Sequence, residues 1–378
     1  MNILICIDAF KGSLSSLEAG NACAVGIQRV FPEANFIIRP LADGGEGTTE
    51  TLVSGLHGKY RTVTVSDPLG RPIQSQYSIL PDGTAVIEMV AASGLPLLEK
   101  SERNPMKTTT FGFGEMICDA VKSGCRNFIL GIGGSATNDG GVGCLQALGF
   151  VFLDADGHNV LFGAEGLGQI AAISENHIMP ELRDCSFHVA CDVKNPLCGE
   201  SGCSAVFAPQ KGADAVMIAQ MDDALSRFAK LTKKYHPDAN ADFPGAGAAG
   251  GLGFGLMSYL NASLEPGVEL ILRETNIAEA MKSVDYVITG EGCLDAQTAM
   301  GKAPIGIARL AKSYGKPVIA FSGAVRAGAE QCNQAGVDAY FPILRWIESL
   351  EDAMQPDHAA QNLSDAAEQV FRLIKTFT

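Results

Sequence analysis

Apolar and polar positions follow a strand–helix–strand rhythm at both ends of the chain. The predicted elements are Ile3–Ile7, Ser15–Val30 and Asn35–Arg39 near the N-terminus, and Val284–Thr289, Lys302–Tyr314, Val318–Phe321, Asp338–Phe341 and Leu363–Phe377 near the C-terminus. Strands that alternate with helices in this way pair in parallel. We therefore expect the two chain ends to form one doubly wound α/β domain.

The middle of the chain has a different pattern. β-rich segments separated by the turn sequences Asp67–Gly70 and Pro81–Gly83 predict an antiparallel meander. The predicted strands are Tyr60–Val65, Ile73–Ile79, Ala85–Met89, Asn127–Ile132, Ser186–Cys191 and Ser204–Phe207, and the predicted helices are Gly112–Lys122, Gly141–Leu148 and Asp214–Lys233. The fold class is therefore α/β with two domains: residues 1–62 with 284–378 form the doubly wound domain, and residues 63–283 form an inserted α+β domain.

Composition narrows the class of protein. The chain has 378 residues, of which 47% are hydrophobic, enough for two cores. A net charge of −14 disfavours nucleic acid and anionic membranes as partners. No apolar run approaches the roughly 20 residues of a membrane span, and the N-terminus does not resemble a signal peptide. The eleven cysteines include no C-x-x-C pair, so we expect reduced thiols in a cytoplasmic protein.

One glycine-rich loop follows a predicted strand and precedes a predicted helix, from Gly131 to Gly141. Its phosphate-binding candidates are Gly133, Gly134, Ser135, Thr137 and Asn138. Backbone N–H groups and short polar side chains are suited to holding phosphate. The same loop matches a dinucleotide fingerprint, but that motif needs a helix to begin at once, and the loop continues to Gly141.

The loops after the terminal-domain strands carry charged groups. Asp8, Lys11 and Ser13 follow the first strand and precede a helix. After the strand Val284–Thr289 come Gly290, Glu291, Asp295 and Lys302. Ligands bind beyond the carboxyl ends of strands in open α/β sheets, and acids beside a lysine suit magnesium and phosphate.

Two further loops contribute candidates. Asp43, Gly44 and Gly45 combine a carboxylate with a backbone that a ligand can approach closely. Asp192 ends a predicted strand, and Lys211 precedes a helix.

Among the acids, one or two of Asp43, Asp192, Glu291 and Asp295 are expected to hold Mg²⁺. No histidine lies in these loops, so a carboxylate is the expected base. The Gly-rich segment 244–253 has three possible interpretations: a hinge, a segment that packs against a helix, or a further ligand-binding loop.

Together these motifs resemble one family. DAFKGSLSS, ADGGEGT, GGSATNDGG, APQKGA and TGEGCLDAQTAMGKAP, in this order, are similar to the bacterial glycerate kinases of the first type, and the likeness covers essentially the whole chain. The family usually has a basic residue where this chain has Cys293.

This resemblance implies a flavodoxin-like domain and a second domain likened to a restriction-enzyme fold. It also implies transfer of the γ-phosphate of ATP to D-glycerate, with the 2-hydroxyl favoured and the 3-hydroxyl open, and Mg²⁺ as a cofactor. Asp192, Asp295, Lys11 and Lys302 are the predicted catalytic residues. The alternatives are another small-molecule kinase, an NAD(P)-dependent oxidoreductase or a non-enzymatic sensor, and the protein is expected to be a monomer or a homodimer.

Overall fold

The computed structural model describes residues 1–41, 58–275 and 277–377, and these form two compact units. Unit 1 contains residues 1–41 and 268–377, and unit 2 contains residues 58–267. The sequence pattern placed residues 268–283 in the inserted domain. The structure instead places them in unit 1, because Val268, Ile277 and Met281 are buried in the same core as Leu4 and Ile305.

Unit 1 contains a sheet and the helices around it. Its strands are β1 (Asn2–Ile7), β2 (Asn35–Ile38), β11 (Tyr286–Leu294), β12 (Val318–Val325) and β13 (Ala339–Pro342). Its helices are α1 (Ser16–Gln28), α10 (Gly267–Glu274), α11 (Ile277–Ser283), α12 (Ala296–Ala299), α13 (Ala303–Ser313), α14 (Gln331–Gln334), α15 (Leu350–Ala353) and α16 (Pro356–Lys375).

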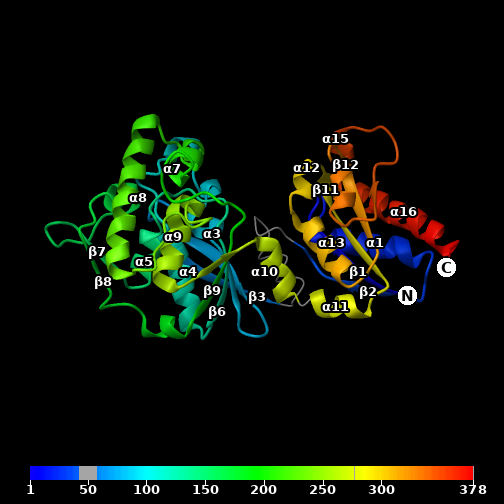
Figure 1. Ribbon diagram of the computed structural model, residues 1–378, viewed down its shortest axis with the longest axis horizontal. Coiled ribbons are helices and arrows are strands. Elements are labelled where there is room, and N and C mark those ends of the chain that lie inside the picture. Colours follow the sequence, from blue (N-terminus) through cyan, green and yellow to red (C-terminus); the bar gives the residue numbers. More distant parts are fainter. Residues whose placement is uncertain (42–57, 276, 378) are drawn as a thin grey trace. The chain divides into compact units, whose positions relative to one another are not determined.

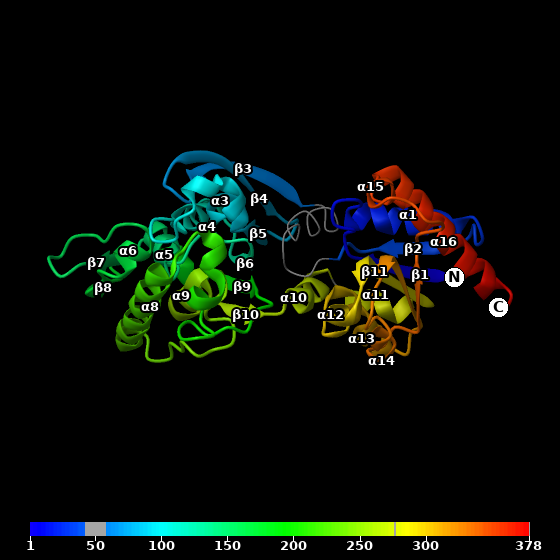
Figure 2. The same ribbon diagram turned by 90° about the horizontal axis from the view of Figure 1, so that it is seen from above.

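The five strands of unit 1 are all parallel, in the order β13-β12-β11-β1-β2. Side chains of β1 alternate between the two faces: Ile3 and Ile5 lie in a core with α1 and α16, whereas Leu4 and Cys6 lie in a core with α11 and α13. Figure 2 shows these helices on opposite faces of the sheet. The strand order reverses between β1 and β11, and such a reversal is where doubly wound sheets bind ligands.

Unit 2 contains more and shorter elements. Its strands are β3 (Lys59–Ser66), β4 (Pro72–Ile79), β5 (Ala85–Glu88), β6 (Asn127–Gly131), β7 (Val151–Leu153), β8 (Ala172–Ser174), β9 (Ser186–Ala190) and β10 (Ser263–Glu265). Its α-helices are α3 (Val90–Ser93), α4 (Phe111–Lys122), α5 (Val142–Ala147), α6 (Gly163–Leu167), α7 (Cys203–Phe207), α8 (Ala215–Tyr235) and α9 (Ala248–Leu260). Short 3₁₀ turns cover Leu95–Leu97, Lys100–Glu102, Pro180–Asp184 and Pro209–Lys211.

The main sheet of unit 2 has the order β10-β9-β6-β5-β4-β3 (Figure 2), and Figure 1 shows the same unit from another side. The pairs β5–β6, β6–β9 and β9–β10 are parallel, whereas β3, β4 and β5 form the expected antiparallel meander. The carboxyl ends of β5, β6 and β9 therefore meet at one edge. The mixed α/β class predicted from the sequence is confirmed.

One prediction of secondary structure in unit 2 is wrong, and one helix was not predicted. Ser204–Phe207, predicted as a strand, lies in α7, a helix too short for its apolar period to be distinguished from that of a strand. The glycine-rich stretch before Gly255 contains most of α9, which starts through three residues with positive φ, Ala249, Gly250 and Gly251. Glycine is a poor helix former, so the composition concealed this helix. No described helix is long and apolar enough to cross a membrane.

Candidate functional site

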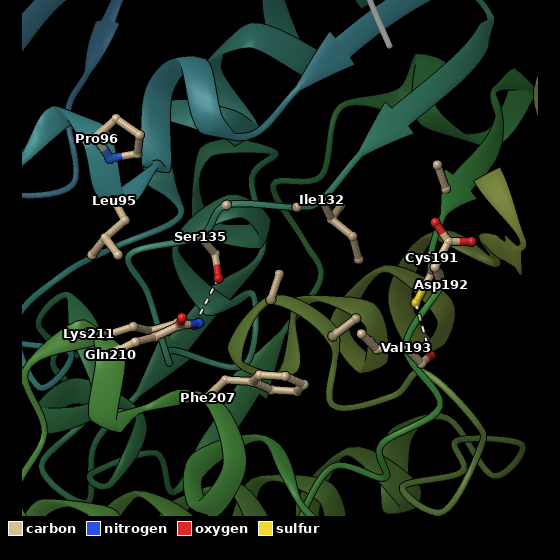
Figure 3. Close-up of a pocket in the computed structure, with 15 residues that line it drawn as sticks. Leu95, Pro96, Ile132, Ser135, Cys191, Asp192, Val193, Phe207, Gln210 and Lys211 are labelled. Atoms are coloured by element: carbon tan, nitrogen blue, oxygen red, sulfur yellow. Dashed lines mark hydrogen bonds between the residues drawn. The ribbon is translucent and has the colours of Figure 1, made fainter. Parts of the chain in front are cut away.

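A pocket of about 430 Å³ lies at the carboxyl ends of the parallel strands of unit 2 (Figure 3). Its polar lining comes from three separate segments: Ser135 after β6, Asp192 after β9, and Gln210 and Lys211 after α7. Its apolar lining includes Leu95, Pro96, Ile132, Val193 and Phe207. The pocket thus brings together Ser135 and Lys211, which are 76 residues apart in sequence.

Lys211 is the buried cation of this pocket. Its side chain is only 2% exposed, and its Nζ donates to Ser135 Oγ at 2.7 Å and to the carbonyl oxygen of Thr137 at 2.6 Å. Burial lowers the pKa of Lys211 to about 8. No salt bridge to Lys211 occurs among the described residues, so its partners are neutral oxygens. An ammonium has three N–H donors, of which these bonds use two. A ligand anion at this position would accept from the third and supply the negative charge that Lys211 lacks as a partner.

The glycine loop beside Lys211 has two exposed residues, Gly133 and Gly134. The carbonyl of Gly134 accepts from the Leu95 amide at 2.8 Å, and the Ala136 amide donates to the Ser93 carbonyl at 3.0 Å. Gly134 has a φ of 72°, which a glycine adopts without strain. These bonds fix the loop and leave its exposed backbone next to the pocket.

Beneath the loop, Thr137, Asn138 and Asp139 are fully buried. Asn138 Nδ2 donates to Ser204 Oγ at 3.0 Å. The Asp139 carboxylate accepts from the Thr110 amide and hydroxyl and from the amides of Gly141 and Gly143, at 2.8 to 3.3 Å. Burial raises the pKa of Asp139 despite these bonds. The side chains of Thr137 and Asn138 therefore lie under the pocket and do not line it, unlike Gly133, Gly134 and Ser135.

The second glycine-rich segment packs against this loop. The Gly140 amide donates to the Gly250 carbonyl at 3.0 Å, and a Cβ at position 250 would lie 2.1 Å from the Thr137 carbonyl oxygen. Only glycine permits so close an approach. Of the three interpretations of residues 244–253, the structure supports helix and loop packing.

Asp192 is the one carboxylate among the described residues that line the pocket of unit 2. It is exposed, follows β9, and accepts from the Gly267 amide through Oδ1 at 3.1 Å. Cys191 also lines the pocket, but burial raises the pKa of its thiol to about 11. Near neutral pH, the Cys191 thiol is therefore protonated.

A second pocket, of about 450 Å³, lies wholly within unit 1 at the strand-order reversal between β1 and β11. Its charged lining residues are Asp8, Lys11, Glu291, Asp295, Lys302 and Arg326. Its apolar lining residues include Phe10, Ile343, Leu344, Leu350 and Met354.

The acids of the unit 1 pocket have defined contacts. Glu291 is largely buried, accepts from the Thr298 hydroxyl at 2.6 Å, and has its Oε2 at 3.8 Å from Lys302 Nζ. Asp295 Oδ1 accepts from the amides of Gln297 and Thr298 and so caps α12. Burial acts to raise the pKa of Asp295, but these backbone hydrogen bonds outweigh it and hold that pKa below its ordinary value. Asp295 is consequently a better ligand for a cation than an acceptor of a proton.

Comparisons with known proteins identify the family of this chain. The pattern of the glycerate kinase family matches residues 3–375. The chain belongs to the glycerate kinase family. A protein named glycerate kinase from Haemophilus influenzae is 46% identical over 375 residues, covering 99% of each chain. One named glycerate 2-kinase from Escherichia coli is 45% identical over 357 residues, covering 94% of this chain and 93% of that one.

A solved structure of a relative has the same fold. The crystal structure of a Salmonella typhimurium protein, provisionally named glycerate kinase 2, is 42% identical and has a TM-score of 0.92 to this chain. The match covers 100% of this chain and 98% of that chain.

The predicted site residues of this glycerate kinase family member fall into two groups. The unit 2 pocket brings together Gly133, Gly134, Ser135, Asp192 and Lys211. The unit 1 pocket brings together the second group, which comprises Asp8, Lys11, Ser13, Glu291, Asp295 and Lys302. The predicted residues Asp43, Gly44 and Gly45 lie outside the described residues.

Sequence reasoning missed two residues. Arg326 lines the unit 1 pocket together with Cys293, and so adds a third cation to those of Lys11 and Lys302. It follows β12, so its place after a strand was a usable signal. Asp139 was seen only as part of the loop, because two of its four donors come from Thr110, which lies outside every motif.

Gly290 has a packing role in this kinase family member. A Cβ on this residue would lie 2.0 Å from the Phe321 carbonyl oxygen of the paired strand β12, and Gly290 does not line the pocket. Gly290→Ala is expected to lower the free energy of unfolding by about 2 kcal/mol, since two paired strands cannot move apart cheaply. Urea unfolding measures this. Gly292→Ala is the matched control, because its Cβ would meet nothing closer than 3.5 Å; equal losses in both variants would contradict the packing role.

Proposed function

We propose that this chain is an ATP-dependent kinase that phosphorylates D-glycerate, with 2-phospho-D-glycerate as the favoured product and 3-phospho-D-glycerate as the alternative. The observation that carries the proposal is the buried ammonium of Lys211, whose partners are neutral and which lies in the same pocket as a carboxylate, Asp192. A small hydroxy acid has the complementary groups, an anion and a hydroxyl. The name of the Escherichia coli relative supports the 2-hydroxyl.

In this mechanism, Lys211 binds the carboxylate of D-glycerate and Asp192 accepts the proton of the attacking hydroxyl. The exposed backbone of Gly133 and Gly134 lies where it can donate to phosphoryl oxygens. Lys11 and Lys302 supply positive charge to the phosphates of ATP. Phosphoryl transfer depends mainly on positioning and on neutralising charge, and these groups provide both.

The carboxylates of unit 1 fit Mg²⁺. Glu291 and Asp295 offer oxygen ligands within one pocket, and oxygen is the ligand atom that Mg²⁺ prefers. Glu291 and Asp295 would hold the ion, and Mg²⁺ when bound would neutralise charge on the phosphoryl oxygens. Thr298 orients Glu291 through its hydroxyl, and its amide orients Asp295.

We further propose that unit 1 is the flavodoxin-like domain and unit 2 the domain likened to a restriction-enzyme fold. Numbered within the unit, the strands of unit 1 have the order 2-1-3-4-5, which flavodoxin-like sheets share. An oxidoreductase is not favoured, because α5 begins at Val142, well beyond the end of the dinucleotide fingerprint at Ala136.

The decisive test is incubation of the purified protein with Mg-ATP and D-glycerate, with the product identified by phosphorus NMR. We expect 2-phospho-D-glycerate and ADP. Formation of 3-phospho-D-glycerate would show that the 3-hydroxyl is phosphorylated, and the kinase proposal would stand. No ATP consumption with D-glycerate would overturn the proposal.

The pH dependence follows from Lys211. Burial lowers its pKa from 10.5 to about 8, so the ammonium is charged below pH 8 and increasingly neutral above it. Because the anion binds the charged form, the KM for D-glycerate is expected to rise about tenfold per pH unit once the pH exceeds the pKa. Steady-state kinetics from pH 6.5 to about 9.5 would measure this.

The control for that experiment is Lys211→Met, which removes the titrating group and keeps an apolar chain of similar length. Its KM should be high and nearly flat across the same range. A wild-type KM that does not change with pH would show that Lys211 is not the group that binds the carboxylate.

A further inference from the structure

The segment 344–350, which contributes two lining residues to the unit 1 pocket, exposes several large apolar side chains. Trp346 is 57% exposed, Ile347 103% and Leu350 76%, and Leu344 is exposed as well. All four lie in residues 344–350, and Leu344 and Leu350 line the pocket itself. Single exposed apolar residues are common, but a group at the edge of a pocket marks a place where a ligand is bound.

The lining of this pocket contains apolar and cationic side chains beside the carboxylates of Asp8, Glu291 and Asp295. Phe10, Leu350 and Met354 contribute apolar surface, whereas Lys302 and Arg326 contribute positive charge. No hydrogen bond or ion pair of the Arg326 guanidinium occurs in the part of the chain that the structure describes. An exposed guanidinium with all of its donors available is well suited to bidentate binding of phosphate.

These features differ from those of the unit 2 pocket. There the cation is one buried ammonium that has already used two of its donors, which suits a single small anion. The unit 1 pocket instead offers several cations beside an apolar wall, in a volume of about 450 Å³. D-glycerate has no flat apolar part that such a wall could cover.

We propose that the unit 1 pocket is the nucleotide site, with the purine base against Leu344, Leu350 and Met354, and the phosphates against Lys302 and Arg326. This inference rests on the proposed function, because it assigns one of the two substrates of that reaction to one pocket. The position of the pocket supports it, since doubly wound sheets bind nucleotides where the strand order reverses. Arg326 is thereby assigned a phosphate-binding role, and Leu350 a role in base binding.

The single tryptophan of the chain provides the test. Trp346 lies in the same short segment as the pocket-lining residues Leu344 and Leu350, so its fluorescence should change when the purified full-length protein is titrated with Mg-ADP in the absence of D-glycerate. Arg326→Ala and Leu350→Asp are each expected to weaken Mg-ADP binding about tenfold or more. Both side chains are exposed, so both variants should keep the thermal midpoint of the wild type.

Matched controls separate site effects from surface effects. Arg309→Ala and Leu373→Asp alter exposed residues of the same types in unit 1 that do not line the pocket, and they should bind Mg-ADP as the wild type does. Lys211→Met should likewise keep its affinity for Mg-ADP while its KM for D-glycerate rises. Calorimetry gives the same affinities independently of the tryptophan signal.

The results distinguish this inference from the proposed function. If the wild type forms phosphoglycerate but Mg-ADP affinity is lost in Lys211→Met and kept in Arg326→Ala and Leu350→Asp, the nucleotide site is not in unit 1. An absence of Mg-ADP binding to the wild type would also overturn the inference. If Mg-ADP binds as expected but D-glycerate is not phosphorylated, the nucleotide site stands and the proposed substrate is wrong.

Discussion

Asp192→Asn is expected to lower the kcat for D-glycerate phosphorylation by about 10³-fold, within the range typical of a lost general base. Asp192 is the carboxylate that lines the same pocket as Lys211, so it is placed to accept the hydroxyl proton of a bound hydroxy acid. Asparagine retains the oxygen that accepts from the Gly267 amide, so the fold at the end of β9 should be unchanged. A coupled ADP-release assay at saturating substrates measures the effect.

Asp295→Asn provides the contrast. The hydrogen bonds that cap α12 hold the pKa of Asp295 low, so this carboxylate accepts a proton poorly, and a smaller loss of kcat is expected. Weaker Mg²⁺ dependence of the rate would be its separate signature. Glu200→Gln alters an exposed acid outside the pocket and should leave the rate unchanged. Near-normal turnover in both aspartate variants would remove these two residues from the chemistry.

The sequence pattern located most strands and helices because their polar and apolar periods were clear. It found β6, β9 and β11 and the loops that follow them, which is why many of the candidate residues line the two pockets. Periodicity is a local property, so it could not give the order of strands in the sheet. The grouping of Lys211 with Ser135 depends on that order.

The parts that could not be predicted involve close backbone contacts between distant segments. Gly250 and Gly290 both look like ligand-loop glycines in the sequence, yet each is required by a carbonyl oxygen about 2 Å from where its Cβ would be. Those carbonyls belong to Thr137 and Phe321, and nothing in the local sequence indicates the contact. The sequence alone does not distinguish a glycine that lets a ligand approach the backbone from a glycine that lets another segment of the chain pack against it.

The buried carboxylate of Asp139 gives the largest expected effect on stability. Asp139→Ala removes the acceptor for the Thr110 amide, the Thr110 hydroxyl and the amides of Gly141 and Gly143. A buried donor left without an acceptor costs about 1–3 kcal/mol. Burial of the charge itself is costly and its loss offsets part of this, so a decrease of about 4 kcal/mol in the free energy of unfolding is expected.

Asp139→Asn separates the hydrogen bonds from the bulk of the side chain. Oδ2 accepts three of the four bonds and Oδ1 one, so an asparagine with its oxygen at the Oδ2 position keeps three and faces the Gly141 amide with its own NH₂ group. A loss of about 1–2 kcal/mol is therefore expected, clearly less than for alanine. Urea unfolding followed by circular dichroism measures both, with the exposed Asp238→Ala as a control that should change stability by less than about 0.5 kcal/mol. Equal stability of the alanine variant and the wild type would mean that water satisfies these donors, and that Asp139 does not hold the glycine loop against Lys211.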